Sequence, residues 1–375
     1  MPTPFIVLVD APAGEPGAVL EVLERRVESN NLSWRQVFGH GDFDEFGYKN
    51  LAQLEFQTYR RRRYVLALDR EVGPLDTSPE GFPVVRPDTH LAGARVLGST
   101  LVSRESEHNP HLLDEIEITV RPDWQRQGVG SALQTALEDL ASAWGCTTLG
   151  GYSTHEGEQT GDLVMPAEGP FGVRRDAGTR FALKHGYHLA QGERHSVQQL
   201  PEDPRQLAAP DLAEGYGLVS WSGTMAPSLA DGMARLVTAF ESSVPLGELD
   251  YRPQVVTAQR MLDNDRQAHR FNDSVTVAAR HRDTGDLVGY TQLVAAPEQP
   301  EPAWQGITVV LPEHRGHRLG LAIKHAAIRD AAARWPRLRR VHTWNAGEND
   351  YMWAVNEALG YRTAGVAGAW QKKLG

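Results

Sequence analysis

Two segments of the sequence pass from a β-branched strand through a proline turn into a glycine-containing loop that opens a long helix. They are residues 116–133, IEITVRPDWQRQGVGSAL, and residues 306–323, GITVVLPEHRGHRLGLAI. The N–H groups in the first turn of a helix have no intrahelical partner and lie at the positive end of the helix dipole. They can therefore bind a pyrophosphate, and Gly128 and Gly130 would let that ligand approach the backbone closely. The sequence predicts such a phosphate site in each segment.

Other kinds of site lack their residues. A dinucleotide-binding fingerprint requires a third glycine where the first segment has Leu133, and neither segment has the lysine of a P-loop. The sequence contains neither a zinc-protease helix motif nor a serine-hydrolase elbow. The single cysteine, Cys146, cannot form an intramolecular disulfide or a thiolate metal cage. We therefore expect no metal cofactor.

The two segments belong to an internal duplication. When Val120 is placed on Val310, Pro122 falls on Pro312 and Gly130 on Gly320. A repeat of this length is typical of a duplicated domain, because solenoid units span only about 20–50 residues. Segment 200–215, LPEDPRQLAAPDLAEG, has the proline-rich, acidic composition of a linker. We expect an N-terminal domain over 1–203, a linker over 204–215 and a C-terminal domain over 216–375.

Hydrophobic periodicity predicts the same order of strands and helices in both halves. The expected strands of the first half are 63–69, 95–102, 115–120 and 146–152, with helices at 16–29 and 128–144. Those of the second half are 274–280, 286–294, 306–310, 339–344 and 367–373, with helices at 319–335 and 350–359. The stretch 153–178 belongs only to the first half and is rich in Gly, Pro and charge, which indicates a long loop or lid. Each half is expected to have a mixed α/β (α+β) fold.

Charge and composition limit the function further. The 375-residue chain has 38 Lys and Arg against 48 Asp and Glu, a formal net charge of −10. This balance disfavours nucleic-acid binding, which needs a basic face, and is compatible with a cationic substrate such as an amine. The apolar run 5–9 is too short for a signal sequence or a membrane span. We expect a cytoplasmic protein without nucleic-acid or membrane partners, and the sequence leaves its oligomeric state open.

The motif V-x-P-x-x-Q-R-Q-G-V-G at 120–130 resembles the acetyl-coenzyme A loop of the GNAT superfamily of N-acetyltransferases. The second copy, with HRGHRLG at 314–320 and TWNAGENDYMWAVNEALGY at 343–361, is similar to the second half of bacterial tandem GNAT proteins. The resemblance covers nearly the whole chain. It implies two tandem domains, each a mixed, mostly antiparallel twisted sheet flanked by helices, with acetyl-CoA bound where the fourth and fifth strands splay apart.

The resemblance also implies which residues would bind acetyl-CoA. In the first copy these are Ile118, Val120, Gln125, Arg126, Gln127, Gly128, Val129, Gly130 and Ser131. In the second copy they are Thr308, Val310, Arg315, Gly316, His317, Arg318, Leu319, Gly320 and Asn349. Two departures from the family pattern stand out. Arg318 replaces the first signature glycine of the second loop, and Ala182 and Asn356 stand where many relatives have a tyrosine that protonates the leaving thiolate.

Acetyl transfer to an amine needs a base, because a primary amine with a pKa of about 10 is mostly protonated at pH 7. The candidates are Asp114, Glu115 and Glu117, on the strand that leads into the first loop, and Tyr152 on the next strand. Strict alternation would put Asp114 on one face and Glu115 with Glu117 on the other. Ordinary surface carboxylates at a strand end, and core packing of Tyr152, fit the sequence equally well. The second copy has Trp304 and Gln305 at the equivalent place and therefore lacks a carboxylate that could act as the base.

Two further groups of polar residues are expected at solvated positions rather than in a binding site. His155 and Glu156 could line a substrate pocket but are expected on a solvated loop. The run Arg60–Arg63 is expected on a solvated helix end.

The sequence as a whole predicts an N-acetyltransferase that transfers the acetyl group of acetyl-CoA directly to a primary amine, most simply that of a small molecule. The alternative is a catalytically degenerate acyl-CoA-binding sensor or scaffold, which the missing tyrosines favour.

Overall fold

The computed structural model describes residues 3–10, 20–201 and 209–375. The elements of the first half are β1 (Phe5–Val9), α1 (Glu21–Phe38), α2 (Gly47–Glu55), β2 (Arg60–Leu68), β3 (Asp76–Thr77), β4 (Pro83–Val85), β5 (Val96–Glu105), β6 (Leu112–Ile116), β7 (Thr119–Val120), α3 (Val129–Ala143), β8 (Thr148–Glu156), β9 (Leu163–Val164), β10 (Val173–Arg174), α4 (Ala177–Lys184) and β11 (His188–Gln199). Those of the second half are β12 (Tyr216–Ser222), α5 (Ala230–Glu241), α6 (Ala258–Ala268), β13 (Asp273–His281), β14 (Leu287–Ala296), β15 (Gln299–Val310), α7 (Leu319–Arg334), β16 (Arg340–Ala346), α8 (Asp350–Ala358) and β17 (Arg362–Lys373). Part of the expected linker, 204–208, and part of the expected first helix, 16–19, lie outside the described residues, so the domain boundaries stay a prediction.

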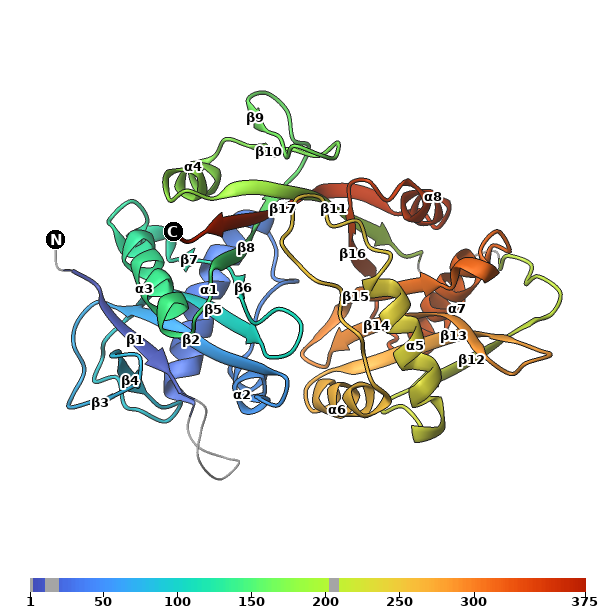
Figure 1. Ribbon diagram of the computed structural model, residues 1–375, viewed down its shortest axis with the longest axis horizontal. Coiled ribbons are helices and arrows are strands. Elements are labelled where there is room, and N and C mark those ends of the chain that lie inside the picture. Colours follow the sequence, from blue (N-terminus) through green and yellow to red (C-terminus); the bar gives the residue numbers. More distant parts are fainter. Residues whose placement is uncertain (1–2, 11–19, 202–208) are drawn as a thin grey trace.

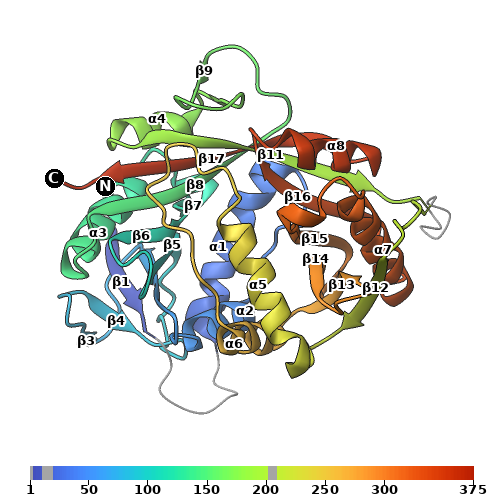
Figure 2. The same cartoon turned by 45° about the vertical axis from the view of Figure 1, so that its right-hand side comes forward.

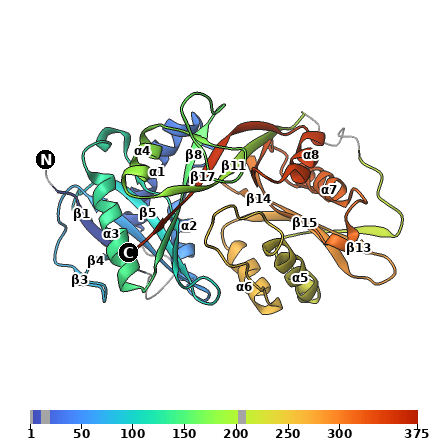
Figure 3. The ribbon, with the colours of Figure 1, turned by 45° about the horizontal axis from the view of Figure 1, so that its top comes forward.

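The last strand of each half pairs with a strand of the other half. One 15-stranded sheet follows the order β12-β13-β14-β15-β16-β11-β17-β8-β6-β5-β2-β1-β4-β3, with β7 beside β5. In it β11 lies between β16 and β17, and β17 lies between β11 and β8, all antiparallel. The two long strands therefore span both halves along one edge of the molecule, and the C-terminus ends beside the first half (Figure 1). The same two strands bridge the halves in the turned views (Figure 2, Figure 3). The mixed, mostly antiparallel sheet with flanking helices is confirmed, and the exchange of strands joins its two halves.

The sheet opens at the same place in each half. β6 runs parallel to β8 and pairs with it from Leu112 to Ile116, whereas β7, which continues the strand, pairs only with β5. In the second half, β15 pairs in parallel with β16 only over Pro302–Trp304, and the rest of β15 pairs with β14. Each half thus has a splay between two parallel strands, just before the glycine-containing loop.

The two loops have the same backbone but carry their glycines at different positions. In the first loop Arg126 and Gly128 adopt left-handed conformations, with φ of 61° and 88°. In the second loop Gly316 and Arg318 do so, with φ of 82° and 56°. The second loop therefore keeps its shape although Arg318 replaces a glycine, at a cost of about 1–2 kcal/mol for a side chain in this conformation.

We expect Arg318→Gly to raise the free energy of unfolding by about 0.5–1 kcal/mol, because the relief of left-handed strain exceeds the entropy cost of a new glycine. Urea unfolding of the variant beside the unchanged chain measures the difference. Arg126→Gly, at the other strained arginine, should show a gain of similar size. A loss of stability in both variants would contradict the shared loop geometry.

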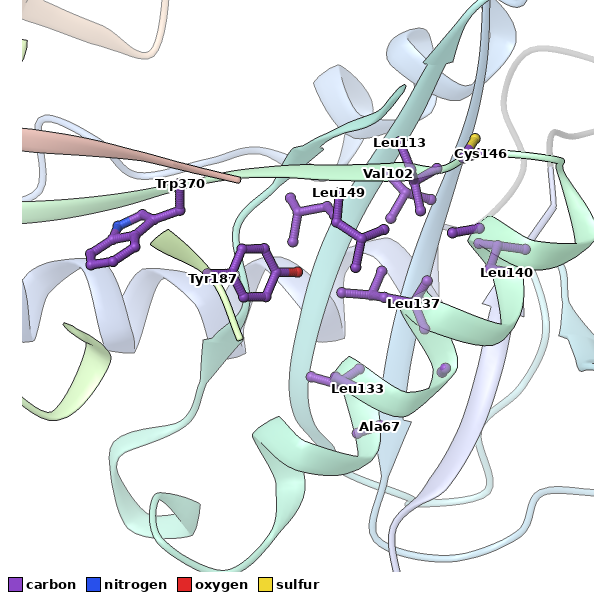
Figure 4. Packing of buried hydrophobic residues seen from close by; sticks show 14 of the residues in the cluster. Ala67, Val102, Leu113, Leu133, Leu137, Leu140, Cys146, Leu149, Tyr187 and Trp370 are labelled. Carbon is purple, nitrogen blue, oxygen red and sulfur yellow. The ribbon is translucent and has the colours of Figure 1, made fainter. Parts of the chain in front are cut away.

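The core of the first half packs helix α3 against the sheet. Leu133, Leu137 and Leu140 form one buried face of α3, and they belong to one cluster with Leu149 of β8 and with Tyr187, which directly precedes β11 (Figure 4). This packing fixes the position of the helix whose first turn follows the glycine-containing loop.

Among the described residues, none of the helices combines the length and the apolar character needed to cross a bilayer.

Three local expectations from the sequence are wrong. Arg60–Arg63 do not end a helix but begin β2, because this segment pairs with residues 102–105 of β5. His155 and Glu156 do not lie on a loop. They form the end of β8, because they pair there with Val366 and Gly365 of β17. The alternation along residues 114–118 fails because Glu115 has a φ of 62° and the pairing with β8 is irregular at this point.

Candidate active site

A cavity of about 570 Å³ lies between the first loop and helix α4. We call it the first-loop cleft. It is lined by Ile118, Val120, Gln125, Arg126, Gly128, Gly130, Ser131, Ala177, Gly178, Arg180, Phe181 and Lys184. The structure thus brings together seven of the nine residues predicted for the first copy. The other two lie outside the lining: Gln127 donates a hydrogen bond to the Asp123 carbonyl oxygen (2.9 Å), and Val129 is buried in the core.

The first-loop cleft suits a polyanion. Its lining contains three cations, Arg126, Arg180 and Lys184, and no carboxylate. None of these three side chains forms an ion pair with another described residue. No atom would approach a Cβ at Gly128, the N-cap of α3, within 4 Å, so the backbone is open to a ligand there, whereas the Phe181 ring lies 3.2 Å from the position of a Cβ at Gly130. Arg180 and Lys184 were missed in the sequence because they lie on α4, whose position beside the loop depends on tertiary packing.

The second loop repeats one contact of the first. The Gln125 side chain donates a hydrogen bond to the Val120 carbonyl oxygen (3.2 Å), and the Arg315 side chain donates one to the Val310 carbonyl oxygen (3.1 Å). Both bonds close the turn between strand and helix in the same way.

The remaining residues predicted for the second copy are spread among structural roles and open positions. Val310 and Leu319 are buried in the core of the second half, and the Thr308 hydroxyl lies 2.7 Å from that of Thr291. Asn349 caps helix α8 by accepting a hydrogen bond from the Met352 N–H (3.1 Å). The predicted loop residues that stay exposed are Arg315, Gly316, His317 and Arg318, and Gly320 has open space in front of it.

A second cavity, of about 590 Å³, lies on the other side of the splayed strand. We call it the acceptor pocket. From the first half it is lined by Arg26, Asn30, Asp42, Phe43, Asp44, Glu45, Phe46, Lys49, Asn50, Gln53, Arg62, Tyr64, Leu101, Glu115, Glu117, Thr119 and Tyr152. From the second half it is lined by Phe271, Asn272, Val294, Gln299 and Trp304. The pocket is therefore built by both halves of the chain.

Residues of a single strand segment alternate between these two cavities. Glu117 and Thr119 line the acceptor pocket, whereas Ile118 and Val120 line the first-loop cleft. Successive side chains of an extended strand point to opposite sides. The segment 117–120 therefore separates the two cavities by the thickness of one strand, at the splay of the sheet.

The four catalytic candidates are distributed over two cavities. Glu117 lines the acceptor pocket, and Glu115 and Tyr152 line both this pocket and a third cavity of about 330 Å³. Asp114 lines only the third cavity, where one of its carboxylate oxygens lies 2.8 Å from the position of a Cβ at Gly150. Asp114 therefore does not share the acceptor pocket with Glu117.

Burial sets the protonation of these groups. Burial, reinforced by the negative charge of Glu45, raises the pKa of Glu117 to about 8. Burial also raises the pKa of Asp114 to about 6. The negative charge of Asp114 raises the pKa of the Tyr152 hydroxyl well above its usual value, so this hydroxyl stays protonated. Glu115 instead accepts charged hydrogen bonds of 3.2 Å from both Arg60 and Arg62, the side chains of the arginine run that share one side of β2.

A chain of buried hydrogen bonds fixes one wall of the acceptor pocket. The His342 Nε2 lies 3.0 Å from the Asp42 Oδ2, and the His342 Nδ1 lies 3.1 Å from the Nε2 of His195. The other nitrogen of His195 lies 3.1 Å from a carboxylate oxygen of Glu156. Although burial opposes it, hydrogen bonds from Arg340 and His342 hold the pKa of Asp42 well below its usual range. The loop between α1 and α2 is thereby tied to strands β8, β11 and β16.

Trp304 and Gln305 of the second copy correspond to the candidate carboxylates Asp114 and Glu115 of the first copy. Trp304 lines the acceptor pocket of the first half. The Gln305 amide is buried and donates hydrogen bonds to the Thr291 hydroxyl (2.7 Å) and the Gln292 carbonyl oxygen (2.8 Å). Trp304 and Gln305 therefore contribute packing and hydrogen bonds at the place where the first copy has carboxylates.

The fold is similar to those of two solved structures. A tandem GNAT protein from the clavulanic acid biosynthesis pathway, solved without AcCoA, is 22% identical with a TM-score of 0.74, covering 99% of each chain. A GCN5-related N-acetyltransferase from Sphaerobacter thermophilus is 15% identical with a TM-score of 0.61, covering 98% of this chain and 95% of that one. No curated protein matches the sequence. The model of the acetyltransferase (GNAT) family matches residues 48–158 and 244–361, which together are more than half of the sequence. This chain, with one matching segment in each half, belongs to the GNAT acetyltransferase family.

Proposed function

We propose that the protein is an N-acetyltransferase that transfers the acetyl group of acetyl-CoA directly to the primary amine of a small molecule in a ternary complex. The observation that carries this proposal is the alternation along residues 117–120 between the first-loop cleft and the acceptor pocket. A donor and an acceptor bound in these two cavities would meet at the splay, where holding both reactants together lowers the barrier to reaction.

The first-loop cleft would hold the donor. The pyrophosphate of acetyl-CoA would lie against the N–H groups of residues 126–131 at the start of α3, where unpaired amides and the helix dipole favour negative charge. The unpaired cations Arg126, Arg180 and Lys184 supply further positive charge. Ile118 and Val120 would offer backbone groups to the pantetheine arm. The lack of any carboxylate in this lining supports the fit.

Glu117 is proposed as the base. Acetyl-CoA supplies a thioester carbonyl carbon, to which the amine nitrogen forms a bond as the C–S bond breaks. The acceptor ammonium loses two protons on its way to the amide: one ends on the released thiol and the other passes to solvent. Glu117, whose pKa is raised to about 8, is proposed to take the first proton in its ionised form, the fraction of which grows as the pH approaches and passes 8. The protonated Tyr152 hydroxyl is proposed to donate its proton to the leaving sulfur and to regain one from the attacking amine, in place of the tyrosine missing at Ala182.

The second copy is proposed to complete the first site. It supplies Phe271, Asn272 and Trp304 to the acceptor pocket, and its last strand, β17, pairs with β8 beside the splay. Its own loop, residues 315–320, is proposed to bind a phosphate-containing ligand in the same way, but Ile307 stands at the position that corresponds to Glu117 and provides no base there.

Calorimetry with acetyl-CoA, combined with thiol release across a panel of primary amines, tests this proposal. We expect binding, and thiol release that depends on an amine and yields the acetylated amine in equal amount. Binding of acetyl-CoA without release with any amine would instead support the sensor or scaffold.

The two α4 cations should contribute to donor affinity. Replacing both Arg180 and Lys184 with alanine should raise the Kd for acetyl-CoA about tenfold or more, because charge-assisted contacts to phosphate are lost. The salt dependence of binding, measured by calorimetry, should weaken as well. Arg337→Ala, at an exposed arginine of the second half, is the control and should leave both quantities unchanged. An unchanged Kd in the double variant would remove α4 from the donor site.

A further inference from the structure

The charged side chains of the acceptor pocket are paired with two exceptions. Eight charged residues line it: Arg26, Asp42, Asp44, Glu45, Lys49, Arg62, Glu115 and Glu117. Six of them form ion pairs, namely Arg26 with Glu45, Arg62 with Glu115, Asp42 with Arg340, and Asp44 with Arg35. Lys49 and Glu117 form no ion pair with any described residue. The pocket therefore offers one unpaired cation and one unpaired carboxyl group.

Lys49 projects from α2 toward the second half of the chain. Its ammonium donates a hydrogen bond to the side-chain carbonyl of Asn272 (3.1 Å) and lies 5.3 Å from the centre of the Phe46 ring. The negative charge of the exposed Glu298, to which the Tyr48 hydroxyl is hydrogen-bonded, acts on Lys49 without forming an ion pair with it. Lys49 is only partly exposed, so its positive charge has lost part of its water without gaining an ionic partner.

Glu117 is the one carboxyl group in the lining of the acceptor pocket that forms no ion pair with a described residue. Its carboxyl group makes no hydrogen bond to any side chain within the described ranges, although Arg26 and Glu45 lie close enough to influence it. Aromatic side chains, including those of Phe43, Phe46 and Trp304, also line the cavity. Removing a charge from water without a partner costs free energy, which a ligand of opposite charge would recover.

We propose that the acceptor is an amine that also carries a carboxylate, with the amine at Glu117 and the carboxylate at Lys49. This inference rests on the proposed function and names the class of its substrate: a zwitterion of the amino-acid type. A single ammonium group matches the single charge of a carboxylate, whereas a phosphate carries more charge and favours several cations or a bidentate arginine. The aromatic part of the lining would accommodate the apolar body that joins the two charged ends.

Matched pairs of amines that differ only in the carboxylate test this inference. With acetyl-CoA, thiol release is measured for glycine against methylamine, β-alanine against ethylamine, lysine against cadaverine, and phenylalanine against phenethylamine. In the pair that fits the pocket best, we expect kcat/KM for the amino acid to exceed that for the plain amine by about tenfold or more, as for a charge-assisted contact. Equal or better turnover of the plain amines would overturn the inference while leaving the acetyltransferase proposal intact. No release with any amine would instead count against the proposed function.

Lys49 variants locate the source of the preference. Lys49→Met should reduce the ratio between the amino acid and its plain amine to near one, and Lys49→Glu should shift the preference toward cadaverine over lysine. Lys372→Met is the matched control, because Lys372 pairs with Glu138 away from this pocket, and the ratio should not change. A ratio that survives Lys49→Met, or a preference for aminoethylphosphonate over β-alanine, would overturn the assignment of a carboxylate to Lys49.

Discussion

Glu117→Gln should lower kcat for acetyl transfer by about 100-fold or more, since positioned acid–base groups contribute factors of this size. The Kd for acetyl-CoA, measured by calorimetry, should stay the same, because Glu117 points away from the first-loop cleft. The variant should also fold at least as well as the original chain at neutral pH. A carboxyl group whose pKa is raised on folding costs stability once the pH exceeds its unfolded pKa, and glutamine removes that cost.

Asp114→Asn is the matched comparison for this experiment. Asp114 is a carboxylate on the same strand but lines only the third cavity, so its variant should keep most of the activity. A larger loss in Asp114→Asn than in Glu117→Gln would contradict the assignment of the base.

The pH dependence of kcat/KM should also reflect the ionisation of Glu117. A base must be deprotonated to act, and burial raises the pKa of Glu117 to about 8. We therefore expect kcat/KM for the amine to rise with pH with a midpoint near 8, and this step to disappear in Glu117→Gln. Any rise that comes from ionisation of the amine itself would remain in the variant. A midpoint near 6, where burial places the pKa of Asp114, would favour the third cavity instead.

Gly128→Trp should abolish acetyl-CoA binding to the first-loop cleft, with a loss of at least about 100-fold in affinity. The indole would occupy the open space in front of the first turn of α3, where the account places the pyrophosphate. Calorimetry on a chain whose second loop is also disabled, by Gly320→Trp, measures the first cleft alone.

Gly128→Ala separates steric blockage from backbone strain. Gly128 has a φ of 88°, so alanine introduces left-handed strain without filling the cleft. Arg318 already adopts this conformation in the second loop, with a φ of 56°. We expect Gly128→Ala to bind acetyl-CoA within a few-fold of the unchanged protein, and Gly128→Trp not to bind it. Equal loss in both variants would mean that strain alone disrupts the loop.

The parts of the fold that depend on local sequence could be predicted. The strand, proline turn and loop at 116–133, and its repeat at 306–323, are encoded by neighbouring residues. The structure places a helix after each loop, at α3 and α7. Periodicity along α3 indicated its buried leucine face, because that face repeats within the helix itself.

What sequence patterns missed depends on distant contacts. The exchange of β11 and β17 between the halves is a long-range pairing that no local pattern encodes. Glu115 adopts a left-handed conformation that a glutamate rarely has, and it lines both the acceptor pocket and the third cavity that holds Asp114. Trp304 lines that pocket only because the second half lies against the first.

A crystal structure with acetyl-CoA bound would show directly whether the donor and the acceptor meet across segment 117–120. We expect the pyrophosphate against residues 126–131, and the thioester at the splay, within reach of an amine held beside Glu117. Acetyl-CoA bound only at the second loop, or with its thioester directed away from segment 117–120, would contradict this expectation.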